Sequence, residues 1–158
     1  MTTIPLTRRG AVKLKEELHR LKTVERHAVI GAISEARAQG DLTENAEYEA
    51  AKDKQGFIEG RILEIESKLA AAQVIDPSTL DAGGRVVFGS TVDLEEEASG
   101  AEVTYQIVGD DEADLKLGLI SIGSPIARAM IGRSAGDVAD VQAPGGVKRY
   151  EIVEVRYV

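Results

Sequence analysis

The feature that most constrains the fold is a run of mainly apolar residues in the first half of the chain, spaced alternately by three and four positions. Its members are Tyr48, Ala51, Gln55, Ile58, Ile62, Ile65, Leu69 and Ala72. On an α-helix these residues form one stripe, and a heptad repeat of this kind is typical of a coiled-coil seam. The sequence therefore predicts a long helix that buries this stripe against a partner helix.

A second apolar stripe precedes the first and supplies that partner. It consists of Leu14, Leu18 and Leu21 and, after a polar interruption, of Val29, Ile33 and Ala36. Thr7 has the residue type of a helix N-cap, and Gly40 is a helix-stop signal. Because only a few residues separate the two helices, they are predicted to pack antiparallel as a hairpin.

Charge supports pairing of the two helices with each other. Residues 8–39 carry a net charge of +4, whereas residues 41–76 carry −5. Opposite charges beside a seam favour an internal partner over a second chain. Pattern alone nevertheless leaves open a structural or dimerising coiled coil.

The bend between the helices, residues 40–52, reads GDLTENAEYEAAK. Asp41 followed by Glu44 has the form of a capping box at the start of the second helix, which is the structural interpretation. In the functional interpretation, Glu44 lies about 60° around that helix from Asp41, so both carboxylates can aim at one point. Two carboxylates can hold Mg²⁺ only when waters and substrate phosphates complete its octahedron. We therefore expect a shared Mg²⁺ that is not bound to the isolated chain.

Two basic residues, Arg37 and Lys52, flank the bend. They are either phosphate contacts or ordinary solvated charges on a helix, and spacing alone does not decide between these roles.

The second half of the chain changes from helical to alternating periodicity after a linker, residues 77–84. Ser124 followed by Pro125 resembles an N-cap and first helical residue, with Gly132 as the stop. The predicted strands are Val86–Phe88, Thr91–Leu94, Val103–Val108, Val138–Val141 and Tyr150–Tyr157. The expected fold class is α+β: an antiparallel helical hairpin over residues 1–76, then a small antiparallel sheet with one short helix over residues 85–158.

Composition excludes several function classes. The chain has 158 residues and a net charge of −8, a poor basis for autonomous binding to duplex nucleic acid. It has no Cys, which excludes disulfides and thiolate metal sites. No apolar run is long enough to cross a membrane, and no signal peptide is evident, so we expect a cytoplasmic protein.

Several separated motifs together resemble one family. They are IPLTRRG near the start, the bend sequence, QGFIEGRI, AQVID, GRVVFGSTV, IVGDDEAD and SPIARAMIG. In this combination and order the chain is similar over its whole length to the bacterial Gre transcript-cleavage factors, which are transcription elongation factors. The resemblance implies an N-terminal coiled coil and a C-terminal domain of FKBP-like fold. Lys52 stands where the family often has Arg, which preserves the charge.

The resemblance also implies a mechanism. The C-terminal domain docks on RNA polymerase, and the coiled coil enters the secondary channel of the polymerase. There Asp41 and Glu44 would help to hold a second Mg²⁺, and the intrinsic nuclease of the polymerase would cut backtracked RNA. The factor is then a co-catalyst and not an enzyme, and it meets the nascent RNA 3′ end and DNA only inside the elongation complex. Arg37 and Lys52 become expected RNA contacts.

The same resemblance makes one C-terminal segment the expected polymerase-docking surface. Its residues are Ser121, Ile122, Gly123, Ser124 and Pro125. Without the resemblance, two interpretations stay open: the segment is only a strand end followed by the start of a helix, or it is a docking surface.

Three other functions compete with this interpretation. A channel-binding competitor would share the architecture but would not need both carboxylates. A peptidyl-prolyl isomerase is suggested only by analogy of fold and lacks the expected aromatic pocket. A coiled-coil dimer is excluded if the protein is a monomer, which we expect.

Overall fold

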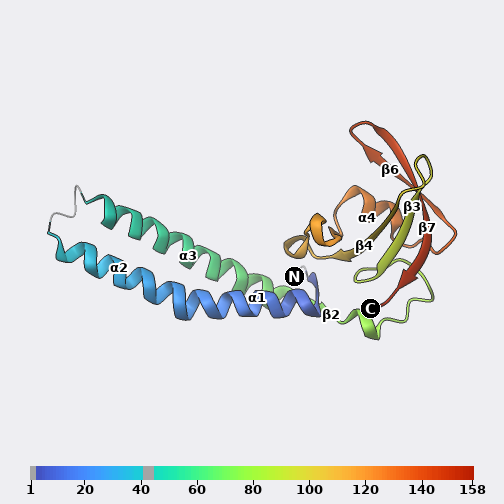
Figure 1. Cartoon of the computed structure of the whole chain (residues 1–158). Helices are drawn as coiled ribbons and strands as arrows, with labels where there is room; N and C mark the ends of the chain where they lie inside the picture. Colours follow the sequence, from blue (N-terminus) through green and yellow to red (C-terminus); the bar gives the residue numbers. More distant parts are fainter. Residues whose placement is uncertain (1–2, 41–44) are drawn as a thin grey trace. The chain divides into compact units, whose positions relative to one another are not determined.

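The computed structural model describes residues 3–40 and 45–158. Two arms form a helical hairpin (Figure 1). The first arm consists of α1 (Arg8–Arg20), a π-helical turn η1 (Leu21–Glu25) and α2 (Arg26–Ala38), and the second is α3 (Ala46–Ala71). With 26 residues, α3 is about 39 Å long.

The predicted seam is confirmed. The buried members of the predicted stripes are Leu14, Leu21, Val29 and Ala36 on the first arm and Ala51, Ile58, Ile62 and Ile65 on α3. Full burial of a large aliphatic side chain contributes about 1.5–3 kcal/mol. The hairpin therefore depends mainly on its Leu, Ile and Val contacts, while Ala36 and Ala51 add little near the bend.

The π-helical turn explains how the first stripe stays in phase. Its buried members Leu14, Leu21, Val29 and Ala36 are separated by seven, eight and seven residues. An eighth residue adds about 100° of rotation on an α-helix and would move Val29 off the seam. A π turn accommodates one extra residue, and η1 lies within this longer interval. The polar interruption in the sequence is thus a change of helical pitch and not a break in the helix.

Ion pairs join the two arms beside the seam, as the opposite charges predict. Arg26 forms a two-point contact with Glu59, with N···O distances of 2.7 and 2.9 Å. Arg61 donates in the same way to Glu17, at 2.7 and 2.9 Å. The hydrogen bond from Arg61 is the main cause that lowers the pKa of Glu17, and partial burial opposes it.

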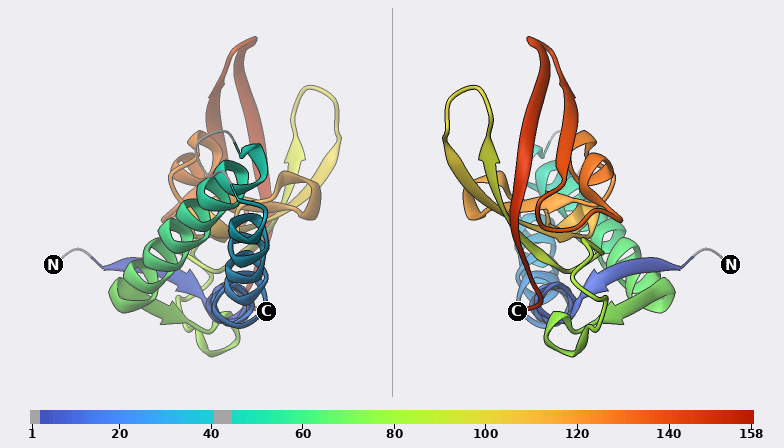
Figure 2. Two further views of the ribbon diagram at one scale, coloured as in Figure 1. Left: turned by 90° about the vertical axis from the view of Figure 1, so that its left-hand side faces the viewer. Right: turned by 90° about the vertical axis from the view of Figure 1, so that its right-hand side faces the viewer.

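Five strands form the sheet of the C-terminal unit, in the order β5-β4-β3-β7-β6. Their bounds are β3 (Thr91–Glu96), β4 (Glu102–Val108), β5 (Leu119–Ser121), β6 (Val138–Ala143) and β7 (Gly146–Arg156). Figure 2 shows β6 and β7 as a long two-stranded ribbon.

The sheet is mixed, so the prediction of a purely antiparallel sheet is wrong at one pair. β4 and β5 are parallel, with Ile107 opposite Ile120. The ten residues between these strands include the 3₁₀ turns η3 (Asp110–Glu112) and η4 (Leu115–Leu117). They carry the chain back along β4, so that β5 begins at the same end as its neighbour.

The predicted strand Val86–Phe88 is also wrong. This segment has no ladder partner over its length, although Val86 donates from its N–H to Arg133 O at 2.8 Å and accepts from Gly132 N at 2.8 Å. Val86 and Phe88 are buried in the core with Val92, Ile107 and Ile152. Their alternating pattern reflects burial of a loop and not a strand.

One short helix, α4 (Pro125–Met130), covers this core, as predicted. Ala127 and Met130 are fully buried among residues of the sheet. Ser124 is its N-cap, since the Ser124 hydroxyl accepts from the Ala127 N–H at 3.3 Å.

The N-terminal strand belongs with the sheet-containing unit. The described chain divides into Ala11–Ala72 and a second unit of Thr3–Gly10 and Gln73–Val158, which differs from the predicted boundaries of 1–76, 77–84 and 85–158. β1 (Ile4–Thr7) pairs with β2 (Ala72–Ile75). The carboxylate of Glu112 also accepts hydrogen bonds from the N–H and hydroxyl of Thr7. Within the described residues, no helix is long and apolar enough to span a membrane.

Candidate functional site

The closed end of the hairpin, residues 36–52, begins where α2 stops. Ala36 O accepts from Gln39 N, and Arg37 O accepts from Gly40 N, both at 3.2 Å. Gly40 has φ = +106°, a conformation that strongly favours glycine. Gly40 is therefore confirmed as the residue that turns the chain out of the first arm.

The second arm, α3, is preceded by Asn45, a residue that was not among the predicted helix caps. The Asn45 side chain accepts from the Tyr48 N–H at 3.1 Å and is the N-cap of α3. The prediction of Asp41 as N-cap in a capping box with Glu44 is therefore wrong for this helix. Asn, like Asp, is a preferred N-cap residue. Asn45 directly precedes Ala46, the first residue of α3, as an N-cap must.

Asp41 and Glu44 lie outside the described residues. The described helix α3 begins at Ala46, so it does not include the positions of Asp41 and Glu44. Both carboxylates are nevertheless confined by sequence to the short connection between Gly40 and Asn45, whose two ends are described. Their convergence on one point stays a prediction.

The basic residues are exposed on the two arms of the hairpin. Arg37 lies in the last turn of α2, next to the buried Ala36. Lys52 lies in α3 beside the buried Ala51, and its ammonium donates to Gln55 Oε1 at 3.1 Å. Both charges are thus near the connection and open to a partner, while contact with RNA stays a prediction.

Across residues 3–40 and 45–158, the structure contains no group of three or more His, Cys, Asp or Glu side chains able to enclose a metal. The described chain therefore offers no complete metal centre of its own. A pair of carboxylates in the connection would need ligands from outside.

The segment predicted to dock on a partner is held by hydrogen bonds. The Ser121 hydroxyl donates to the Asp110 carboxylate and accepts from Gly123 N at 3.1 Å. Ile122 is half-buried and packs against the core, whereas Gly123 and Pro125 are exposed. The structure thus leaves the glycine and the proline most available to another molecule, and gives Ile122 a packing role.

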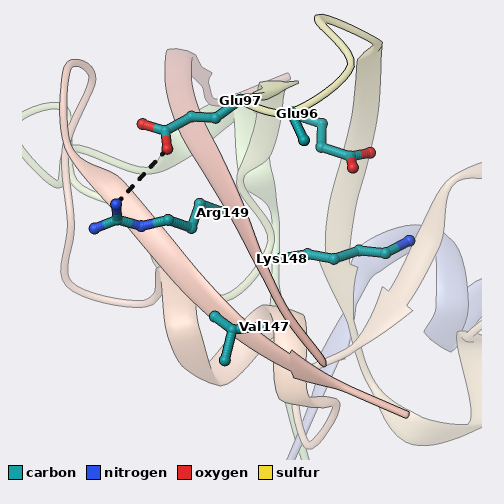
Figure 3. A pocket seen from close by; sticks show the side chains of 6 residues that line it. Glu96, Glu97, Val147, Lys148 and Arg149 are labelled. Carbon is teal, nitrogen blue, oxygen red and sulfur yellow. Dashed lines mark ion pairs between the residues drawn. The ribbon is translucent and has the colours of Figure 1, made fainter. Parts of the chain in front are cut away.

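A separate surface pocket lies beside the β6–β7 ribbon and has a volume of about 310 Å³ (Figure 3). It is lined by Glu96, Glu97, Ala98, Val147, Lys148 and Arg149. Arg149 is already paired with Glu97 at 3.9 Å and with Asp140 at 2.9 Å. The four charged lining residues are two of each sign, Glu96 and Glu97 with Lys148 and Arg149, so the pocket lining carries no net charge.

Comparisons with known proteins identify the family. Residues 4–74 match the family model described as "Transcription elongation factor, N-terminal", and residues 81–157 match "Transcription elongation factor, GreA/GreB, C-term". The chain is 73% identical to the transcription elongation factor GreA of Polaromonas naphthalenivorans, over 100% of both chains. It is 62% identical to GreA of Neisseria meningitidis serogroup A, again over 100% of both. The chain belongs to the GreA/GreB family of transcription elongation factors.

Solved structures of similar proteins include two related factors. A GreA/GreB factor from Nitrosomonas europaea is 26% identical, with a TM-score of 0.43 and coverage of 99% of this chain and 100% of that one. GreA factor homolog 1 of Thermus thermophilus is 28% identical, with a TM-score of 0.43 and coverage of 98% and 99%.

Proposed function

We propose that this chain binds RNA polymerase and stimulates the polymerase to cleave backtracked nascent RNA, so that arrested elongation resumes. The observation that carries the proposal is the sequence GDLTENAEYEAAK at the closed end of a two-helix hairpin, in a chain of the GreA/GreB family. α2 ends at Ala38, just before Gly40, and Asn45 is the N-cap of α3, which supports the assignment of the acidic residues to the connection.

The chemistry of the acidic residues fits a shared magnesium ion. Asp41 and Glu44 supply carboxylate oxygens, which are the ligands that Mg²⁺ prefers, but two carboxylates leave most of the octahedron open. When bound, such an ion stabilises charge on the attacking and leaving oxygens of a phosphodiester. The chain would therefore complete a site in the polymerase and would not act as a nuclease alone.

Other residues of the closed end would orient the RNA. Arg37 and Lys52 are exposed on the two arms and could each contact a phosphate oxygen of the RNA. A guanidinium can make a two-point contact, whereas an ammonium acts as a point charge. Slender packing around Ala36 and Ala51 would suit entry into a channel.

The sheet-containing unit would provide the docking contact. Its segment Ser121–Pro125 is ordered by Asp110 and by the start of α4, and two of its residues are exposed. Docking there would place affinity for the polymerase in one unit and the acidic residues in the other. Binding and stimulation of cleavage are then separable properties.

The test uses purified RNA polymerase stalled on a template with labelled, backtracked RNA. Adding the chain with Mg²⁺ should shorten the RNA from its 3′ end, and elongation should resume when nucleotides are added. The chain incubated with the same RNA but without polymerase should leave it intact. Binding without any stimulation of cleavage would instead identify a competitor for the channel and would overturn the proposal.

A further inference from the structure

Asn45 uses both ends of its side-chain amide at the closed end of the hairpin. The amide oxygen accepts from the Tyr48 N–H at 3.1 Å, in the first turn of α3. The amide nitrogen donates to Ala36 O at 2.9 Å, in the last turn of α2. One side chain therefore joins the end of the first arm to the start of the second.

Both bonds need an amide in this orientation. Tyr48 presents a donor and Ala36 an acceptor, so a rotated amide would place like groups against each other. An Asp side chain could accept from Tyr48 but could not donate to Ala36. A Ser side chain could form the cap but is too short to reach the other arm as well.

The bond between Asn45 and Ala36 closes a segment of the chain that contains the acidic residues. The two bonded residues are nine positions apart, and Ala36 is only 2% exposed. The partners of Asn45 are thus a buried backbone carbonyl and a helix terminus, which are both fixed by the seam. Closing the segment limits where its intervening residues can lie.

We propose that Asn45 is the positioning residue for Asp41 and Glu44, because it fixes both ends of the connection that carries them. This inference rests on the function proposed above. Asn45 touches neither metal nor RNA in this role. It would act through the two helix ends that flank the connection, because its hydrogen bonds join Ala36 of α2 to Tyr48 of α3.

The test compares Asn45→Ser with the unchanged chain on stalled polymerase. Ser keeps the cap of α3 but loses the bridge to Ala36, and it adds no charge. At saturating factor, the cleavage rate should fall about fivefold, the equivalent of one neutral hydrogen bond. The Mg²⁺ concentration for half-maximal cleavage should rise, while the factor concentration for half-maximal cleavage should stay the same.

Gln39→Ser is the matched control. Gln39 is an exposed polar residue at the other end of the same connection, and its side chain makes no hydrogen bond that the described residues show. This variant should match the unchanged chain in all three quantities. Independently of activity, hydrogen exchange at the Gln39 and Gly40 amides should be faster in Asn45→Ser, because the last turn of α2 loses its brace.

Three outcomes would overturn the proposal: an unchanged rate at saturation, an effect on polymerase affinity alone, or unchanged exchange at the end of α2. If Asn45→Ser does not fold, Asn45→Thr is measured by the same criteria, since Thr also keeps the cap, cannot reach Ala36 O as well, and adds no charge. If the unchanged chain itself stimulates no cleavage, the proposed function fails. If the chain stimulates cleavage and Asn45→Ser equals it, only the inference about Asn45 fails.

Discussion

Gly40 is the residue at which backbone conformation most restricts the choice of amino acid in the hairpin. Its φ of +106° is unfavourable for any residue with a Cβ atom. Gly40→Ala should therefore lower the free energy of unfolding by about 1–2 kcal/mol, although among the described residues no atom beyond its chain neighbours lies within 4 Å of the new methyl group. Urea unfolding followed by circular dichroism measures the change.

A second glycine provides the control for this prediction. Gly31 lies inside α2, and its φ is not positive. Apart from the neighbouring turns of α2 itself, no described atom lies within 4 Å of the position of its missing Cβ. Gly31→Ala should raise the stability by about 0.5–1 kcal/mol, since alanine has the higher helix propensity. Equal effects of the two substitutions would show that the conformation of Gly40 is unimportant.

The ion pair between Glu17 and Arg61 predicts a dependence of stability on pH. The hydrogen bond from Arg61 lowers the pKa of Glu17 below its ordinary value of 4.5. A lowered folded-state pKa means that the contribution is present above about pH 4.5 and is lost as the pH falls through the folded-state value. Because about a third of the side chain is exposed, the contribution at pH 7 is only about 0.5 kcal/mol.

Thermal unfolding of Glu17→Gln from pH 7 to pH 3 checks this contribution. The variant should melt at a lower temperature than the unchanged chain at pH 7, and the two curves should converge at the acidic end. Glu16 is an exposed neighbour whose carboxylate has no ion pair among the described residues. Glu16→Gln should therefore melt at the same temperature as the unchanged chain throughout this pH range. A difference that stays constant across the range would contradict the assignment to ionised Glu17.

Among the secondary-structure elements, the π-helical turn η1 should tolerate the loss of one residue, which a regular α-helix on the seam should not. Deleting Thr23 from η1 would change the interval between Leu21 and Val29 from eight residues to seven. The first arm could then continue as an α-helix with its stripe on the seam. We expect the free energy of unfolding to change by less than about 1 kcal/mol, since the exposed Thr23 side chain contributes no core contact.

Deletion of Ala32 from α2 is the matched comparison. It would shift the stripe by about 100° between Val29 and Ala36, where the spacing is already seven, and should cost several kcal/mol. The two deletions are compared by denaturant unfolding. Similar losses from both would mean that η1 does not compensate for an inserted residue.

Much of the architecture could be predicted because it depends on periodicity. The seam residues of α3, the stop at Gly40 and the cap at Ser124 each follow from local sequence, and the structure confirms them. The parallel pairing of β4 with β5 could not be predicted, because the path of the chain between two strands leaves no periodic signal. Val86–Phe88 shows the opposite limitation, since an alternating apolar pattern can also belong to a buried loop.

The sequence pointed to the acidic residues of the candidate site, whose role stays a prediction, but it did not point to Asn45. Asp41 and Glu44 attract attention by their charge, whereas Asn45 is a neutral residue whose importance depends on a carbonyl nine positions away. A tertiary hydrogen bond of this kind has no signature in the sequence. The one signal for Asn45 was its residue type, since Asn is a preferred N-cap. Asp41, four residues earlier, is also of a preferred N-cap type, so residue type alone did not decide between them.

In the whole molecule, binding to the polymerase and stimulation of cleavage are expected to belong to different units. The sheet-containing unit would bind the polymerase through Ser121–Pro125, and the hairpin would bring carboxylates to the RNA. Each unit has its own buried residues, the seam in one and the sheet core in the other. A change in the acidic connection should therefore leave the docking unit intact.

The most direct measurement of the central claim is RNA cleavage by stalled polymerase with the double variant Asp41→Asn, Glu44→Gln at saturating concentration. Both substitutions preserve size and remove the negative charge that would hold Mg²⁺. Stimulation of cleavage should fall at least about 100-fold, the range seen when a group that stabilises transition-state charge is lost, while affinity for the polymerase should stay unchanged. Full cleavage by the double variant, or loss of binding in its place, would contradict the claim that these carboxylates act in catalysis.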